Sequence, residues 1–182
     1  MTNPTSLTLS MPERLARARA DLRMGVPVVL VQAGQAALAV PAETLTADRL
    51  ADLRAMGPAV MAITGRRAAT LKARAYDGDL ARVLLPGDAG RDWVQAVADP
   101  ADDLKTPMKG PLTTQRDGPA DLHRAALQLA KSARLLPACL VVPVADGRAV
   151  AAEAGLTLID LDQARGQLGI SSPLHDIVSA RL

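Results

Sequence analysis

A buried hairpin is predicted by the stretch Val28-Val29-Leu30-Val31-Gln32-Ala33-Gly34-Gln35-Ala36-Ala37-Leu38-Ala39-Val40. Its first four residues form a short apolar run, which is typical of a buried strand. The glycine-containing residues 32–35 predict a turn, and the apolar residues 36–40 predict a return strand. The stretch therefore forms a hairpin-like unit.

Helix and strand signals alternate on both sides of this unit. Before it, Ser10-Met11-Pro12-Glu13 is a capping-box sequence, and an apolar face then predicts a helix that ends near Gly25. After it comes a helix capped by Thr44 or Thr46. Further strands are predicted at 59–64, 80–85, 139–144 and 157–159. Further helices are predicted at 66–72, 91–98, 119–135 and 147–154, with a last helix ended by Gly169. This alternation predicts an α/β (α+β) fold with a mixed sheet flanked by helices.

Length and composition predict one domain. The chain has 182 residues, of which 49% are hydrophobic and 22% are charged, a profile typical of a soluble globular domain. We place the domain at residues 10–169, with residues 1–9 as a leader and residues 170–182 as a tail or linker. Residues 99–119 form the longest irregular stretch, and a loop of this length in a compact domain is usually functional or mobile.

The composition excludes several function classes. Aromatic residues are 1% of the chain, which argues against nucleic-acid binding by base stacking, and 21 basic against 19 acidic residues leave no marked excess of positive charge. The single cysteine, Cys139, excludes an internal disulfide and a cysteine-based zinc site. We expect no metal and no cofactor. No signal peptide or membrane-length apolar stretch is visible, so we expect a cytoplasmic protein without a membrane partner.

Few residues stand out as candidates for chemistry, and no common catalytic or phosphate-binding motif occurs. His123 is a candidate ligand or base, but a surface position on a helix flank is the interpretation we favour. For Cys139, in an apolar strand, we favour a buried structural thiol over a reactive one. A cluster of Asp99, Asp102 and Asp103 suits a hard cation, although a solvated loop with a turn cap explains it more simply.

The order of several segments resembles one enzyme family. Residues 22–31, which include Arg23, Gly25 and Pro27, resemble the opening of 3,4-dihydroxy-2-butanone 4-phosphate synthase, a riboflavin-pathway enzyme that acts on ribulose 5-phosphate. The segments that resemble later parts of that family follow in the same order and are 40–46, 57–64, 109–112 and 130–138. The resemblance spans roughly residues 14–144. It implies the synthase fold and a homodimer.

The chain departs from this family at the positions that carry the family's chemistry. The family's acidic loop, which supplies metal- and substrate-binding groups, corresponds here to the uncharged residues 32–35. Its Gly-His-Thr-Glu-Ala motif corresponds to residues 121–125, so the metal-binding histidine becomes Leu122 and the acid/base glutamate becomes Arg124. Arg124 would repel Mg²⁺. The resemblance therefore implies a degenerate synthase-like domain with no catalytic residues.

Degenerate domains of this kind resemble the N-terminal half of some bacterial GTP cyclohydrolase II proteins. We therefore expect a non-catalytic accessory domain of riboflavin biosynthesis whose partner is a GTP cyclohydrolase II catalytic domain. The alternative is a metal-independent enzyme, or a module that binds an anion or small molecule, such as a phosphate-bearing one, in the remnant cleft. The candidate binding residues of that cleft are Arg116, His123, Arg124, Glu43 and Thr64.

Overall fold

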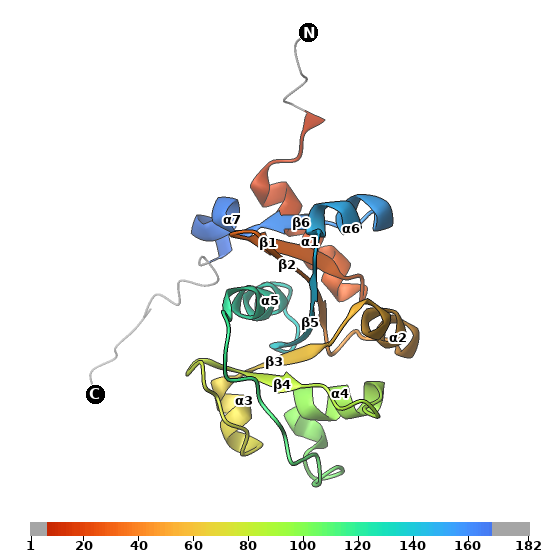
Figure 1. Cartoon of the computed structure of the whole chain (residues 1–182), viewed down its shortest axis with the longest axis vertical. Coiled ribbons are helices and arrows are strands. Elements are labelled where there is room, and N and C mark those ends of the chain that lie inside the picture. The colour runs from red at the N-terminus through yellow and green to blue at the C-terminus, as the bar shows by residue number, and fades with distance from the viewer. Residues whose placement is uncertain (1–6, 169–182) are drawn as a thin grey trace, which may run out of the picture.

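A computed structural model describes residues 7–168, the side chain of Asp102 excepted. One six-stranded sheet runs through the molecule in the order β4-β3-β5-β2-β1-β6 (Figure 1). Its strands are β1 (Val28–Gln32), β2 (Gln35–Pro41), β3 (Val60–Thr64), β4 (Leu80–Leu84), β5 (Ala138–Val144) and β6 (Leu158–Asp160). Strands β1 and β6 are parallel, and all other neighbours are antiparallel. The predicted mixed sheet is confirmed.

Helices cover both faces of the sheet. One face packs against α1 (Met11–Arg23), α5 (Asp121–Ser132) and α7 (Leu161–Leu168). The other face packs against α2 (Ala47–Met56), α3 (Gly65–Thr70), α4 (Arg91–Ala98) and α6 (Gly147–Ala154). Successive strand residues point to opposite faces, so Val28 and Leu30 contribute to the first core while Val29 contributes to the second. Because both faces are covered, the central strands are apolar throughout.

The helix ends confirm most of the capping predictions. The Glu13 carboxylate accepts from the Ser10 backbone N–H at 2.8 Å at the start of α1. Thr46, not Thr44, caps α2, because its hydroxyl accepts from the Arg49 N–H at 3.2 Å. Thr44 instead donates to the Leu22 carbonyl at 2.9 Å and so ties the hairpin exit to α1. The predicted tail, 170–182, lies outside the described residues. None of the helices between residues 7 and 168 is long and apolar enough to cross a bilayer.

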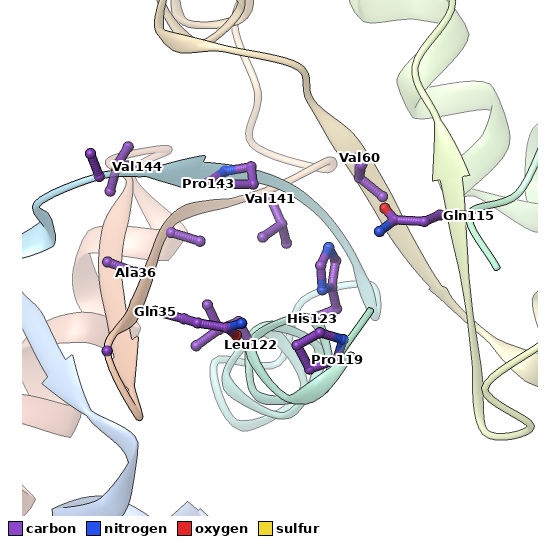
Figure 2. A pocket seen from close by; sticks show the side chains of 13 residues that line it. Gln35, Ala36, Val60, Gln115, Pro119, Leu122, His123, Val141, Pro143 and Val144 are labelled. Atoms are coloured by element: carbon purple, nitrogen blue, oxygen red, sulfur yellow. The ribbon is translucent and has the colours of Figure 1, made fainter. Parts of the chain in front are cut away.

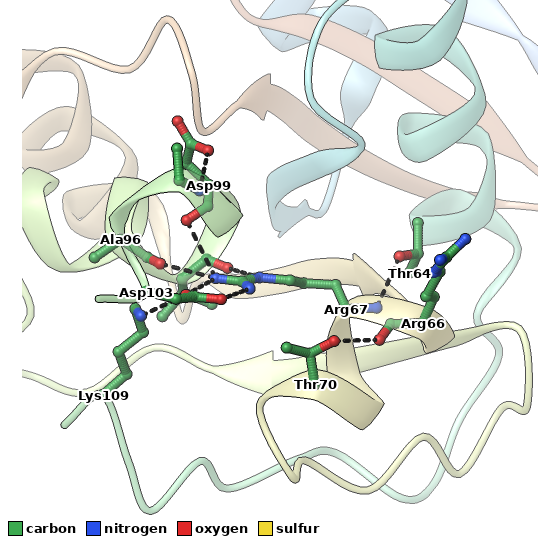
Figure 3. A network of polar contacts seen from close by, with 10 residues as sticks. Thr64, Arg66, Arg67, Thr70, Ala96, Asp99, Asp103 and Lys109 are labelled. Atoms are coloured by element: carbon green, nitrogen blue, oxygen red, sulfur yellow. Dashed lines mark hydrogen bonds and ion pairs between the residues drawn. The ribbon is translucent and has the colours of Figure 1, made fainter. Parts of the chain in front are cut away.

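The irregular stretch 99–119 begins with the short 3-10 helix η2 (Pro100–Asp102) and is anchored by a buried arginine (Figure 3). The Arg67 Nε donates to the Val97 carbonyl at 2.8 Å, where α4 ends, and its Nη1 pairs with Asp103 at 2.6 Å. Lys109 pairs with the other Asp103 oxygen, also at 2.6 Å. The interpretation of Asp103 as a solvated loop residue is therefore wrong. Its carboxylate joins the loop to Arg67 of α3, whose guanidinium also binds carbonyls at the end of α4.

Candidate functional site

A pocket of about 390 Å³ opens beside the first turn of α5 (Figure 2). The register of the sheet explains its position. Ala36, at the start of β2, lies opposite Val144 at the end of β5. The pairing between β3 and β5 ends at Val60 and Val141, so β5 runs on beyond β3 with β2 as its partner. The lining residues are Gly34, Gln35, Ala36, Ala37, Val60, Gln115, Pro119, Leu122, His123, Val141, Pro143, Val144 and Ala145.

Two of the segments that line this pocket are the ones that depart from the synthase family at the positions of its catalytic residues. Gly34 and Gln35 come from the segment that corresponds to the family's acidic loop. Leu122 and His123 come from the segment that corresponds to its Gly-His-Thr-Glu-Ala motif. The structure therefore brings residues of both segments to this cavity, whose lining contains no Asp, Glu, Lys or Arg. Gln32, Asp121 and Arg124, from the same two segments, line a second pocket.

His123 points into this pocket from the start of α5 (Figure 2). Its side chain is 8% exposed, and neither ring nitrogen has a hydrogen-bond partner among residues 7–168. Burial, with a smaller contribution from the nearby Arg82 charge, lowers the pKa of His123 to about 4. The ring is therefore neutral at pH 7 and offers one donor and one acceptor. The interpretation of His123 as a surface residue is wrong, because this turn of α5 faces the sheet.

Arg82 holds the loop that closes one side of the pocket. Its guanidinium is buried, pairs with Asp77 at 2.8 Å and donates to the Asp117 carbonyl at 3.1 Å. Its own backbone carbonyl accepts from the Gln115 N–H at 2.7 Å. Neither Arg82 nor Gln115 is among the residues predicted from the sequence. The signal for Arg82 was a lone charge inside the apolar strand 80–85, five residues after an aspartate.

The two arginines predicted for the remnant cleft have other partners. Arg124 pairs with Asp79 through two contacts, Nε to Oδ2 at 2.6 Å and Nη2 to Oδ1 at 2.9 Å. This pair holds the pKa of Asp79 below its ordinary range and raises the pKa of Arg124. The Arg116 guanidinium lies 5.9 Å from the centre of the Tyr76 ring. Neither arginine lines the pocket that contains His123.

Glu43 and Thr64, the two remaining predicted residues, accept hydrogen bonds from backbone N–H groups. The Glu43 carboxylate accepts from the Leu136 N–H at 2.7 Å, just before β5. The Thr64 hydroxyl caps α3 by accepting from the Arg67 N–H at 3.2 Å. Of the five predicted binding residues, His123 lines this pocket and the other four lie elsewhere.

The candidate cysteine and aspartates have structural surroundings. Cys139 is 1% exposed, its thiol donates to the Ala126 carbonyl at 3.4 Å, and burial raises its pKa to about 12, which confirms the prediction of a buried structural thiol. Asp99 caps η2 by accepting from the Ala101 N–H at 2.9 Å, as a turn-capping residue does. The side chain of Asp102 lies outside the described part. Within that part, no three His, Cys, Asp or Glu residues gather in a way that could hold a metal ion.

Comparison with known proteins gives one sequence relative and several structural ones. No protein-family model matches the chain. The chain is 37% identical over 141 residues to GTP cyclohydrolase-2 of Azospirillum brasilense, a match that covers 75% of this chain and 36% of the relative. The chain therefore spans about a third of that relative's length.

The structural neighbours share one fold. A two-domain 3,4-dihydroxy-2-butanone 4-phosphate synthase from A. baumannii superposes with a TM-score of 0.62 at 15% identity, over 82% of this chain and 56% of that one. A synthase of the same name in complex with two magnesium ions gives a TM-score of 0.60 at 13% identity, over 90% of this chain and 98% of that one. At such identities the likeness shows the fold.

The pocket does not suit magnesium ions. Magnesium prefers charged oxygen ligands, usually carboxylates. The polar side chains that line this pocket are the amides of Gln35 and Gln115 and the imidazole of His123. The donor set is therefore uncharged, and it offers a hard divalent cation no carboxylate.

Proposed function

Because this chain has the 3,4-dihydroxy-2-butanone 4-phosphate synthase fold and is similar over most of its length to a GTP cyclohydrolase-2, we propose that it is a non-catalytic accessory domain of riboflavin biosynthesis. Its partner in this proposal is a GTP cyclohydrolase II catalytic domain. The domain, placed at residues 10–169, forms a homodimer in the cytoplasm and supports or regulates that partner. It binds no nucleic acid.

One observation carries the non-catalytic part of the proposal. The cavity beside His123 is lined by residues of both segments that depart from the family, yet its lining contains no carboxylate. Chemistry on a sugar-phosphate enediolate needs a divalent metal or a general acid/base pair beside the reacting carbons. His123 is the titratable side chain of this pocket, and its low pKa makes it a weak base at pH 7.

The anion-binding alternative has less support. An anion needs a cation or several donors to replace its hydration. Arg124 is already paired with Asp79, and Arg116 lies on Tyr76. An uncharged small molecule is the version of the alternative that this pocket favours.

The absence of synthase activity is tested by proton NMR of the purified chain with ribulose 5-phosphate and Mg²⁺. We expect formate to form no faster than in the tube without protein. Formate that appears at a rate proportional to the protein concentration would show that other groups replace the missing acids, and the non-catalytic assignment would be abandoned.

The accessory role is tested with a GTP cyclohydrolase II catalytic domain, alone and in the presence of this chain. We expect the chain to change the turnover of GTP, the melting temperature or the sedimentation coefficient of that domain. The same sedimentation run on the chain alone measures the homodimer. If the turnover, melting temperature and sedimentation are all unchanged, the accessory role is excluded.

A further inference from the structure

The side chain of His123 is unusual in this molecule because it is buried without a partner. Both of its ring nitrogens are inaccessible and unpaired among the described residues, although the ring borders a cavity (Figure 2). A buried donor or acceptor without a partner is energetically costly, so such groups usually serve a ligand or a function. The neutral ring offers a ligand one N–H and one lone pair.

Two amide side chains complete the polar lining. Figure 2 shows Gln35 and Gln115 on opposite sides of the pocket, with the His123 ring between the two amides. The Gln115 Nε2 donates to the Asp117 carbonyl at 2.9 Å, which fixes the orientation of this amide. Gln35 is exposed at the start of β2, so its amide is free to turn toward an occupant. Each amide group pairs well with a neighbouring N–H and C=O.

The rest of the lining sets the shape and charge of the occupant. Val60, Val141, Pro143 and Leu122 provide apolar walls. A volume of about 390 Å³ accommodates a molecule of one or two rings. A charged group would lose its hydration here without a counter-charge, because no ionised side chain lines the pocket at pH 7. The occupant that suits these walls, this volume and the polar groups of His123, Gln35 and Gln115 is a small ring compound. It is uncharged and able both to donate and to accept hydrogen bonds.

We propose that this pocket binds an uncharged nitrogen heterocycle of the cyclic-amide type, a ring in which an N–H lies beside a C=O. Gln35 and Gln115 are its hydrogen-bond partners, and His123 becomes the third when its ring turns to present a nitrogen to the cavity. The ring faces lie against the apolar walls. This assignment does not depend on the accessory role, since it concerns the cavity alone, and it differs from a sugar-phosphate site in needing neither a cation nor a metal.

The test is an NMR titration of the isotope-labelled full chain with three probes. Uracil and hypoxanthine are uncharged cyclic amides with one and two rings. Orotate has the uracil ring with an added carboxylate and so isolates the effect of charge. We expect at least one of the two neutral probes to shift the His123 ring nitrogens and the backbone amides of residues 34–37 at millimolar concentration. Orotate is expected to bind at least about tenfold more weakly than uracil.

Three variants test whether the probes bind in this pocket. His123→Leu keeps the apolar volume but removes both nitrogens, and Gln115→Ala removes a loop amide without touching the core. Each is expected to weaken binding about tenfold. Arg124→Ala changes the same helix outside the pocket and should leave binding unchanged. If His123→Leu does not fold, Gln115→Ala carries the test alone.

The proposal is overturned by any of three results. The first is that neither neutral probe shifts the pocket signals, which would leave water as the occupant. The second is that orotate binds as tightly as uracil. The third is that the shifts persist unchanged in His123→Leu and Gln115→Ala. None of these results bears on formate production or on the cyclohydrolase partner, so failure here is distinct from failure of the proposed function.

Discussion

Arg124 and Asp79 form a two-point ion pair that joins the first turn of α5 to the turn before β4, with contacts of 2.6 and 2.9 Å. Arg124 occupies the position that corresponds to the synthase family's acid/base glutamate. Its side chain lies outside the His123 pocket, because the next residue along a helix is rotated by about 100°. At this position the arginine holds the turn before β4 and, with Gln32 and Asp121, lines a pocket separate from that of His123.

The Arg124–Asp79 pair is expected to contribute little to stability. Both side chains are at least one-third exposed, and such pairs contribute about 1 kcal/mol or less. The pKa of Asp79 is lowered in the folded chain, so the contribution is present above the ordinary pKa of 3.8 and is lost as the pH falls through the folded-state pKa. A double-mutant cycle with Arg124→Ala and Asp79→Asn, in urea at pH 7 and at acid pH, measures it. A coupling that grows on acidification would contradict this account.

The Arg67 network is expected to be essential for folding. Arg67 is 8% exposed and makes five hydrogen bonds, to Asp103 and to the carbonyls of Ala96, Val97 and Asp99. Arg67→Met removes the partner of these three carbonyls and leaves Asp103 with Lys109 alone, and we expect the free energy of unfolding to fall by about 3 to 5 kcal/mol. Urea denaturation measures the loss. Arg66→Ala, at the exposed neighbouring position of α3, is the matched control and should change stability by about 0.5 kcal/mol or less.

Replacement of His123 is expected to stabilise the chain in the absence of a ligand. His123→Leu removes two unpaired buried nitrogens, and we expect a gain of about 1 to 3 kcal/mol in the free energy of unfolding at pH 7. A gain of this kind is typical of sites where function opposes stability. Chemical denaturation of both proteins measures it. A variant less stable than the original chain would show that the nitrogens have partners that stabilise the fold.

The pH dependence of stability provides a second measure of the same residue. The folded-state pKa of His123 is about 4, against an ordinary value of 6.5, so the unfolded chain takes up a proton in this window while the folded chain does not. Stability should therefore decline as the pH falls from 6.5 to 4, by up to about 3 kcal/mol. His123→Leu should lose this part of the decline. If the free energy of unfolding depends on pH equally in the two proteins, the buried neutral ring of His123 is refuted.

Cys139 is expected to be unreactive in the folded chain. Its pKa of about 12, against an ordinary 9.0, reduces the thiolate fraction about a thousandfold, and the side chain is almost fully covered. Iodoacetamide labelling followed by mass spectrometry should therefore be slow in buffer and fast in urea. Rapid labelling of the folded chain would place the thiol at an accessible position.

Substitution of Gly147, the first residue of α6, is expected to destabilise the fold. A Cβ at Gly147 would lie 2.6 Å from the Ala36 Cβ and 2.9 Å from a Val29 methyl. Gly147→Ala should therefore cost about 1 to 3 kcal/mol, because α6 must move away from the hairpin. Gly166→Ala, in α7, meets no atom within 4 Å and should stabilise by about 0.5 to 1 kcal/mol. Thermal melts of the two variants in parallel provide the comparison.

Much of the fold was predictable because its signals are local. The capping box at Ser10 and Glu13 depends on residues three apart, and the hairpin at residues 28–40 depends on a turn between two apolar runs. Boundaries were less predictable. The helix expected at 119–135 spans Asp121–Ser132, and Pro119 lies before it, with its carbonyl accepting from Arg82 of β4 at 3.4 Å.

The sequence by itself determined the order of the elements and the uncharged character of the turn at residues 32–35, since both are properties of residues close together in the chain. Only the tertiary structure decided which side chains meet. Gln35, Gln115 and His123 come from separate segments, and the register of β2 and β3 against β5 brings those segments to one pocket. Tertiary packing also buries His123 against the sheet and leaves Arg124 on the flank, a difference of one residue on a helix. Which face a helix presents depends on what it packs against.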